Sequence, residues 1–166
     1  MKCNADKTVV VSFTRKHSTY FHDYKLGGSK ISRKLEHRDL GVTVDCKLNF
    51  NCHIEKLLSA GRKSSSLVYW MCKNFRNPST CTLLYSALVR SKLEYCSEAW
   101  AGLGIVDSSK IEQIQKNFLR KVTYRAYGQS KRYAESLIIY NLSKLSIRRT
   151  IKDVTFYLNY LLSNSL

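Results

Sequence analysis

The chain has 166 residues and one proline, with 44% hydrophobic and 24% charged residues. These proportions exclude a disordered, collagen-like or low-complexity chain, and they predict one compact domain or a piece of a larger protein. The 28 lysines and arginines outnumber the 12 aspartates and glutamates, which gives a formal net charge of +16. A charge this high favours a polyanionic partner, and nucleic acid is the first candidate.

Short β-branched segments in the first quarter of the chain predict strands. They are residues 8–13, residues 24–26 and 30–32 on either side of Gly27-Gly28, and residues 40–44. The paired glycines are typical of a hairpin turn. In the last segment Leu40, Val42 and Val44 alternate, which predicts a strand with one apolar face, and Gly41 would allow another backbone to approach closely.

Helical periodicity begins at Asn51. The apolar stripe of the first predicted helix comprises Ile54, Leu57, Leu58, Gly61, Ser65, Val68 and Cys72. Asn77 is a predicted helix cap with Pro78 at the first helical position. The helix that follows is predicted to run to about Trp100 and to be enclosed by neighbours, because its apolar residues lie around most of its circumference. They are Leu83, Leu84, Leu88, Val89, Leu93, Tyr95 and Trp100.

Three further helices are predicted after the break at Gly102 and Gly104. The first is capped by Asp107 or Ser108 and has an inner face of Ile111, Ile114, Phe118, Leu119 and Val122. A shorter helix spans about 133–140, after Gly128. The last helix has Ile147, Ile151, Val154, Leu158 and Leu161 in register. Because the strands and helices are segregated, the predicted fold is α+β and predominantly α: short N-terminal strands and a hairpin over 1–50, then a four- or five-helix bundle over 51–166.

Catalytic motifs are absent from the sequence. The twelve acidic residues are isolated from one another, so they do not form the carboxylate cluster that holds metal ions for phosphoryl transfer. Neither G-x-x-x-x-G-K-[ST] nor G-x-G-x-x-G occurs, and no histidine lies in an arrangement typical of a nucleophile and its base. We therefore predict no catalytic residues, no cofactor and no small-molecule substrate.

The six cysteines predict neither a metal site nor a membrane-exposed or secreted protein. None of them forms a C-x-x-C pair, and Cys46, Cys52 and His53 have no second His/Cys pair downstream to complete a zinc site. The sequence shows no signal peptide and no apolar run long enough to span a bilayer, since the longest uncharged stretch is Val154–Leu166. The expected compartment is the nucleus or the cytoplasm, with reduced thiols and no membrane partner.

Basic residues concentrate in the C-terminal helices, where residues 110–153 contain eleven basic and three acidic residues. The strongest candidates for phosphate contacts are those expected at helix ends or on outer faces. They are Arg120, Lys121, Arg125, Lys131, Arg132, Arg148 and Arg149. A solvated basic surface without a ligand is the alternative for each of them. Most of the aromatic residues Tyr69, Trp70, Tyr85, Tyr95, Trp100 and Phe118 are expected in the core.

Several segments, in this order, resemble the C-terminal part of a non-LTR retrotransposon reverse transcriptase of the jockey-like group. They are residues 9–15 (VVVSFTR), Tyr24 to Gly28, 38–45 (RDLGVTVD) with the following His53 and Ile54, 88–95 (LVRSKLEY) with Trp100, 111–120 (IEQIQKNFLR) and Leu142 to Asp153. The similarity covers nearly the whole chain.

This resemblance implies that residues 1–50 correspond to the end of the palm and the primer grip, with Leu40, Gly41 and Val42 supporting the primer end. Residues 51–166 would then form a thumb-like helical domain that holds a primer–template duplex by its sugar–phosphate backbone. The aromatic-Ala-Asp-Asp turn that carries the family's catalytic aspartates does not occur in this sequence. The expected protein is thus a truncated, non-catalytic fragment whose intact parent would be an RNA-directed DNA polymerase. The alternative is a helical protein-interaction module with a basic surface and no nucleic-acid role.

Overall fold

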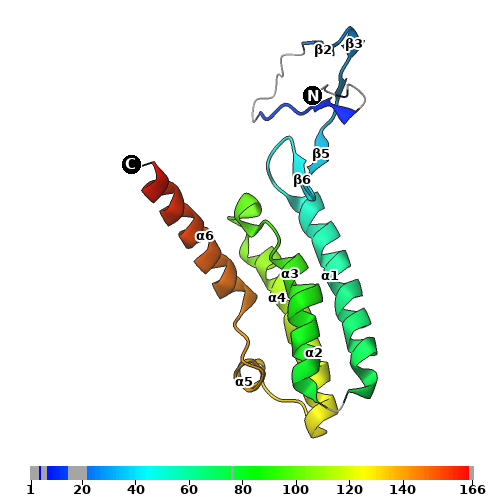
Figure 1. The fold of residues 1–166 in the computed structure, drawn as a ribbon, viewed down its shortest axis with the longest axis vertical. Helices are drawn as coiled ribbons and strands as arrows, with labels where there is room; N and C mark the ends of the chain where they lie inside the picture. Colours follow the sequence, from blue (N-terminus) through cyan, green and yellow to red (C-terminus); the bar gives the residue numbers. More distant parts are fainter. Residues whose placement is uncertain (1–3, 5–6, 15–21, 76, 165–166) are drawn as a thin grey trace. The chain divides into compact units, whose positions relative to one another are not determined.

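The fold is α+β and predominantly helical, as the sequence predicts (Figure 1). This computed structural model describes residues 4, 7–14, 22–75 and 77–164. The parts of the predicted strand region at 1–3, 5–6 and 15–21 lie outside the described residues. The chain divides into two compact units, Met1–Glu55 and Lys56–Leu166, each of which is treated by itself.

The first unit contains three pairs of short strands. Strand β1 (Val9–Val10) pairs in parallel with β4 (Ser32–Arg33), and β2 (Lys25–Leu26) pairs antiparallel with β3 (Ser29–Lys30). Gly27 and Gly28 form the turn between β2 and β3 with φ angles of 57° and 84°. Because both central residues have positive φ, this turn needs glycine-like conformations, and the predicted hairpin is confirmed.

The third pair is a hairpin of β5 (Glu36–Asp39) and β6 (Val42–Asp45), in which Asp39 lies opposite Val42. Leu40 and Gly41 form its two-residue turn, with φ angles of 44° and 90°. The prediction of a strand from Leu40 is therefore wrong at its start, because Leu40 lies in the turn and is 84% exposed. Val42 is buried, so the apolar face begins there.

Asp45 organises the connection from this hairpin to helix α1 (Asn51–Met71). Its carboxylate accepts hydrogen bonds from the backbone N–H groups of Lys47, Asn49 and Phe50 at 2.8–3.3 Å. Burial raises the pKa of this carboxyl, but the three backbone donors outweigh burial and hold it below its ordinary value of 3.8. The ionised side chain thus stabilises the entry to the helix.

The second unit begins within α1, at Lys56, and continues into the 3₁₀ turn η2 (Cys72–Asn74). Helix α2 (Pro78–Tyr85) follows and continues through a π-helical turn η3 (Ser86–Arg90) into α3 (Ser91–Leu93). The predicted cap is confirmed, because the Asn77 side chain accepts a hydrogen bond from the Ser79 N–H at 2.9 Å. This cap satisfies a backbone donor that has no partner inside the helix.

The predicted continuous helix up to Trp100 is wrong in two respects. It ends at Leu93, because Cys96 has a left-handed φ of 52°, and a separate 3₁₀ turn η4 (Ser97–Trp100) follows. It is also not enclosed by neighbours, since Leu83 is 69% exposed. Apolar residues around a helix do not by themselves bury every face.

Helices α4 (Ile105–Tyr127), α5 (Tyr133–Ile139) and α6 (Leu145–Ser163) complete the unit. The inner face predicted for α4 is confirmed, because Ile111, Ile114, Phe118, Leu119 and Val122 are all buried. The predicted cap at Asp107 or Ser108 is wrong: the helix begins at Ile105, after Gly104, so Asp107 lies in its first turn. Gly128, with φ 70°, ends the helix.

The core of the second unit includes Tyr85 stacked on Phe118, with ring centroids 4.5 Å apart, and the fully buried Trp100. Two aromatic residues expected mostly in the core are instead on the surface, because Trp70 is 71% and Tyr95 is 54% exposed. The interior is therefore built by α4 and the residues that pack on it.

The apolar residues predicted to share one face of the last helix do not face a core. They are 46–59% exposed: Ile147, Ile151, Val154, Leu158 and Leu161. Only Leu145 and Arg149, in the first turns of α6, are buried. Helical register was predicted correctly, but among the described residues of the unit Lys56–Leu166 no element covers the later turns.

Candidate nucleic-acid interface

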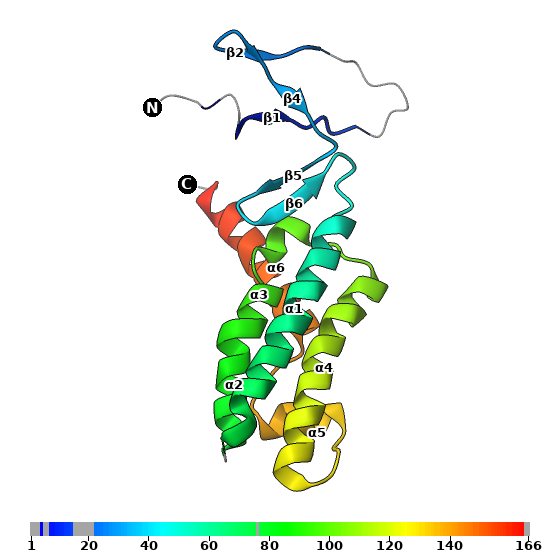
Figure 2. The same ribbon diagram turned by 90° about the vertical axis from the view of Figure 1, so that its right-hand side faces the viewer.

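A groove with a volume of about 240 Å³ lies between α1 and α4. We call it the α1–α4 groove, and it is lined by Arg62, Ser65, Ser66, Lys110, Gln113, Ile114, Asn117 and Lys121. The two helices run side by side in the second unit (Figure 2). The lining residues all lie between Arg62 and Lys121, so the groove is part of the second unit alone.

The two helices approach closely at Gly61. A Cβ atom at this position would lie 2.6 Å from the Leu93 side chain, closer than atoms pack, and 3.1 Å from the Ile114 side chain, which is a tight contact. Further along, Lys121 and Arg125 of α4 contact Tyr69 of α1 and the carbonyl of Cys72 just after it. Because these contacts occur in the same order along both helices, α1 and α4 run parallel.

The groove is positively charged and rich in neutral hydrogen-bonding groups. Arg62, Lys110 and Lys121 line it, and no lining residue is acidic. Lys110 forms an ion pair with Asp107 at 2.7 Å, which leaves Arg62 and Lys121 as its strongest anion-binding groups. Serine hydroxyls and the side-chain amides of Gln113 and Asn117 supply further donors. Such a set suits phosphate and sugar oxygens.

Among the predicted phosphate contacts, Arg120 and Lys121 are exposed on α4. Lys121 lines the groove, and its Nζ lies 5.5 Å from the centre of the Tyr69 ring. Arg132 is exposed directly before α5, and the Lys131 ammonium lies 4.5 Å from the Tyr127 ring. The structure therefore brings only Lys121 of the predicted set into the groove.

Arg125 is engaged within the chain. Its guanidinium donates to the carbonyls of Cys72 at 2.9 Å and Tyr69 at 3.3 Å, and it lies 3.9 Å from the Tyr69 ring centre. These carbonyls belong to the C-terminal end of α1, where backbone acceptors lack helical partners. Arg125 thus closes that end of the helix.

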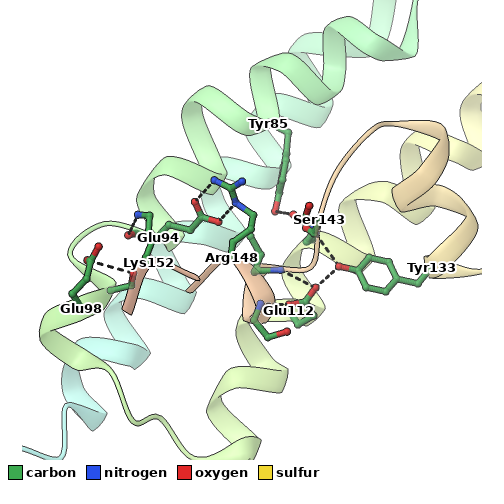
Figure 3. A network of polar contacts seen from close by, with 12 residues as sticks. Tyr85, Glu94, Glu98, Glu112, Tyr133, Ser143, Arg148 and Lys152 are labelled. Atoms are coloured by element: carbon green, nitrogen blue, oxygen red, sulfur yellow. Dashed lines mark hydrogen bonds and ion pairs between the residues drawn. The ribbon is translucent and has the colours of Figure 1, made fainter. Parts of the chain in front are cut away.

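Arg148 forms a partly buried ion pair with Glu94 (Figure 3). The guanidinium donates to both carboxylate oxygens, at 2.6 Å from Nε and 3.1 Å from the second nitrogen. The hydrogen bonds to Glu94 raise the pKa of Arg148. Lys152 donates to the Glu94 backbone carbonyl at 3.1 Å, so α6 is anchored here by two basic residues.

The prediction that Arg149 lies on an outer face or at a helix end exposed to phosphates is wrong. Its side chain is buried, with 7% exposure, and it donates a hydrogen bond to the Ser108 hydroxyl at 2.8 Å. Burial lowers the pKa of this guanidinium. Basic residue type alone did not distinguish a surface cation from one that joins α6 to α4.

The residues that resemble a primer grip in sequence lie in the β5–β6 hairpin of the first unit, at its turn and at the first residue of β6. Leu40 and Gly41 are its exposed turn, and Val42 is buried. Gly41, with φ 90°, serves the turn itself rather than a bulge within a strand.

A buried polar network joins α4, α5 and α6 (Figure 3). Glu112 accepts hydrogen bonds from Tyr133 and from the first N–H groups of α6, at Leu145 and Ser146. Gln115 donates to Tyr133 and to the Ser143 carbonyl and accepts from Tyr85. Burial raises the pKa values of both tyrosines, which keeps them protonated as donors. These contacts hold the start of α6, so the network has a structural role.

Sequence reasoning missed the α1 side of the groove. Residues 56–75 contain four basic residues and no acidic one: Lys56, Arg62, Lys63 and Lys73. This local excess of basic residues could have been detected in the sequence. The prediction of phosphate contacts instead followed the larger excess of basic residues in the C-terminal helices. Lys110 fell within the counted basic region without being singled out.

Within the described residues, no three His, Cys, Asp or Glu side chains gather as a metal site. Five cysteines there are free thiols: Cys46, Cys52, Cys72, Cys81 and Cys96. The pKa of the Cys72 thiol is raised to about 12, mainly by burial and to a smaller extent by a hydrogen bond with Cys81. None of the described helices has the length and apolar character needed to cross a membrane.

The chain is similar to a protein of a nematode. The uncharacterized protein B0403.1 of Caenorhabditis elegans is 31% identical to the chain over 124 residues, which are 74% of the chain and 62% of the relative. The match thus spans less than two thirds of the relative's length. No family model matches the chain, and no solved structure matches it.

Proposed function

We propose that this chain binds nucleic acid through the sugar–phosphate backbone, without reading base sequence and without catalysis of its own. The observation that carries the proposal is the α1–α4 groove, which has three basic side chains and no acidic side chain in its lining. The net charge of +16 supports the same partner, because it attracts a polyanion from a distance.

The sequence resemblance supports a more specific form of this proposal. In that form the second unit is related to the thumb of non-LTR retrotransposon reverse transcriptases, and its natural ligand is a primer–template duplex. The first unit, with the Leu40–Gly41 turn, would then be related to the primer grip. The compartment would be the nucleus or the cytoplasm, where such a duplex is formed.

The test is the salt dependence of binding to a DNA duplex. Changing Arg62, Lys116, Arg120 and Lys121 to glutamine removes four exposed cations and leaves the buried face of α4 intact. Arg62 and Lys121 line the groove, and Lys116 and Arg120 are further exposed cations of α4. Each lost phosphate contact lowers the slope of log affinity against log salt by about 0.9. We expect the slope to fall by about 2 or more, since at least half of these residues touch phosphate in the proposed complex.

A matched control removes the same charge from the first unit. Lys25, Lys34, Arg38 and Lys47 are exposed there, and their change to glutamine lowers the net charge equally. If both variants lose the same slope, binding follows total charge and the groove is not the site. Absence of binding to any nucleic acid at low salt would refute the proposal altogether.

One observation favours a protein-interaction module as the second candidate. The exposed stripe of α6, from Ile147 to Leu161, is the kind of apolar surface that docks another protein. This candidate function predicts that the wild-type protein does not bind nucleic acid in a salt-dependent way. It also predicts that a polar substitution at Leu158 abolishes capture of the protein partner.

A further inference from the structure

Two exposed aromatic side chains border the α1–α4 groove. Trp70 is 71% exposed and lies one helical turn after Ser66, which lines the groove. Tyr124 is 62% exposed and lies one turn after Lys121. Residues three or four positions apart share a helix face, so each aromatic extends the groove surface on its own helix. Because Lys121 pairs with Tyr69, both lie toward the C-terminal ends of the parallel helices.

These two rings differ from their aromatic neighbours. Tyr69 stacks with Arg125 and Tyr127 lies beneath Lys131, so each has a cation on its ring. In the part of the chain that the structure describes, neither Trp70 nor Tyr124 has a ring or cation partner. A solvent-exposed tryptophan is uncommon in a core-forming helix. Its exposure leaves a large flat surface open beside basic residues.

We propose that Trp70 and Tyr124 are stacking positions for unpaired bases, so that the α1–α4 groove prefers a strand with unpaired bases over a blunt duplex. This inference rests on the general form of the proposed function, binding through the sugar–phosphate backbone, and it specifies an unpaired strand as the ligand in place of the primer–template duplex. Arg62 and Lys121 contact the phosphates. Lys63, seven positions before Trp70, and Lys73, three positions after it, add positive charge to the same segment of the chain. Paired bases keep their faces inside a duplex, whereas an unpaired base offers its face to an aromatic ring.

Charge complementarity favours a nucleic-acid strand over a protein at this surface. Trp70 also has exposed apolar neighbours on α1, Leu67 and Met71. A protein partner would use all of these side chains through apolar contact. A nucleic-acid strand would depend on the aromatic ring and the nearby cations, and Leu67 would contribute little. Leu67 is therefore the matched control for Trp70.

The experiment measures the affinity of the full chain for a fluorescent oligo-dT strand and for a blunt duplex of equal length, at several salt concentrations. The variants are Trp70→Ala, Trp70→Phe, Tyr124→Ala and Leu67→Ala. The three substituted positions are all exposed, so the fold survives in the four variants, as circular dichroism would verify. We expect tighter binding of the single strand. Trp70→Ala should weaken it about tenfold, Tyr124→Ala by less, and Trp70→Phe should retain most of the affinity.

Intrinsic fluorescence gives a second readout, because Trp100 is 1% exposed and a strand in the groove cannot stack on it. Oligo-dT should quench the wild-type emission, and the Trp70→Phe variant should lose that quenching. Two results together would overturn the stacking inference and leave the proposed function standing: salt-dependent binding that is equal or tighter for the blunt duplex, and unchanged affinity of the Trp70→Ala variant. Equal losses in Leu67→Ala and Trp70→Ala would overturn it as well. Absence of binding to both probes would refute the proposed function.

Discussion

The ion pair between Arg148 and Glu94 gives the sharpest contrast between a phosphate-binding arginine and a structural one. Glu94 is 4% exposed, and the side chain of Arg148 is 35% exposed. Breaking a fully buried ion pair from one side costs about 3–5 kcal/mol, because a buried charge is left uncompensated. Partial exposure of Arg148 screens the pair, so we expect Arg148→Gln to cost about 2 kcal/mol. For a chain of this size that lowers Tm by about 6 °C.

Thermal unfolding followed by circular dichroism measures this change, with Arg120→Gln as the control. Arg120 is exposed on α4, and its substitution should alter the free energy of unfolding by less than about 0.5 kcal/mol. In the double variant Glu94→Gln/Arg148→Gln, part of the loss should be recovered, since no unpaired carboxylate remains. Unchanged melting of Arg148→Gln, together with weaker nucleic-acid binding, would show that this arginine contacts phosphate and would refute the structural role.

Three further predictions concern Asp45, Phe118 and Leu158. Asp45 has a pKa below its ordinary value of 3.8, so its contribution to stability is complete above pH 3.8 and is lost as the pH falls through the folded-state pKa. NMR titration of the Asn49 and Phe50 amides should therefore show a midpoint below pH 3.8. A midpoint above pH 3.8 would contradict the hydrogen-bonding role of Asp45. Phe118→Ala should cost about 3–5 kcal/mol in chemical unfolding, because its ring is buried against Tyr85. Leu158→Ala should stay within about 0.5 kcal/mol of the wild type, since Leu158 is 52% exposed, and a large loss would mean that the α6 stripe is covered.

Features that depend on neighbouring residues could be predicted from the sequence. Asn77 and Pro78 start α2, and Gly27 and Gly28 form a hairpin turn, as expected. The inner face of α4 also follows from its spacing alone. Capping, turn geometry and helical periodicity are decided within a few residues, so they are already present in a short stretch of sequence.

The candidate site depended on partners that are distant along the chain. Arg148 meets Glu94 across 54 positions, and Arg125 meets the Cys72 carbonyl across 53. Basic residue type did not reveal which cations had such partners, nor that Arg62 and Lys121 would share one groove. The sequence by itself determined the order, type and approximate limits of most helices and turns. Tertiary packing alone decided which cations and aromatic rings are free for a ligand, because burial and ion pairing depend on residues that only the folded chain brings together.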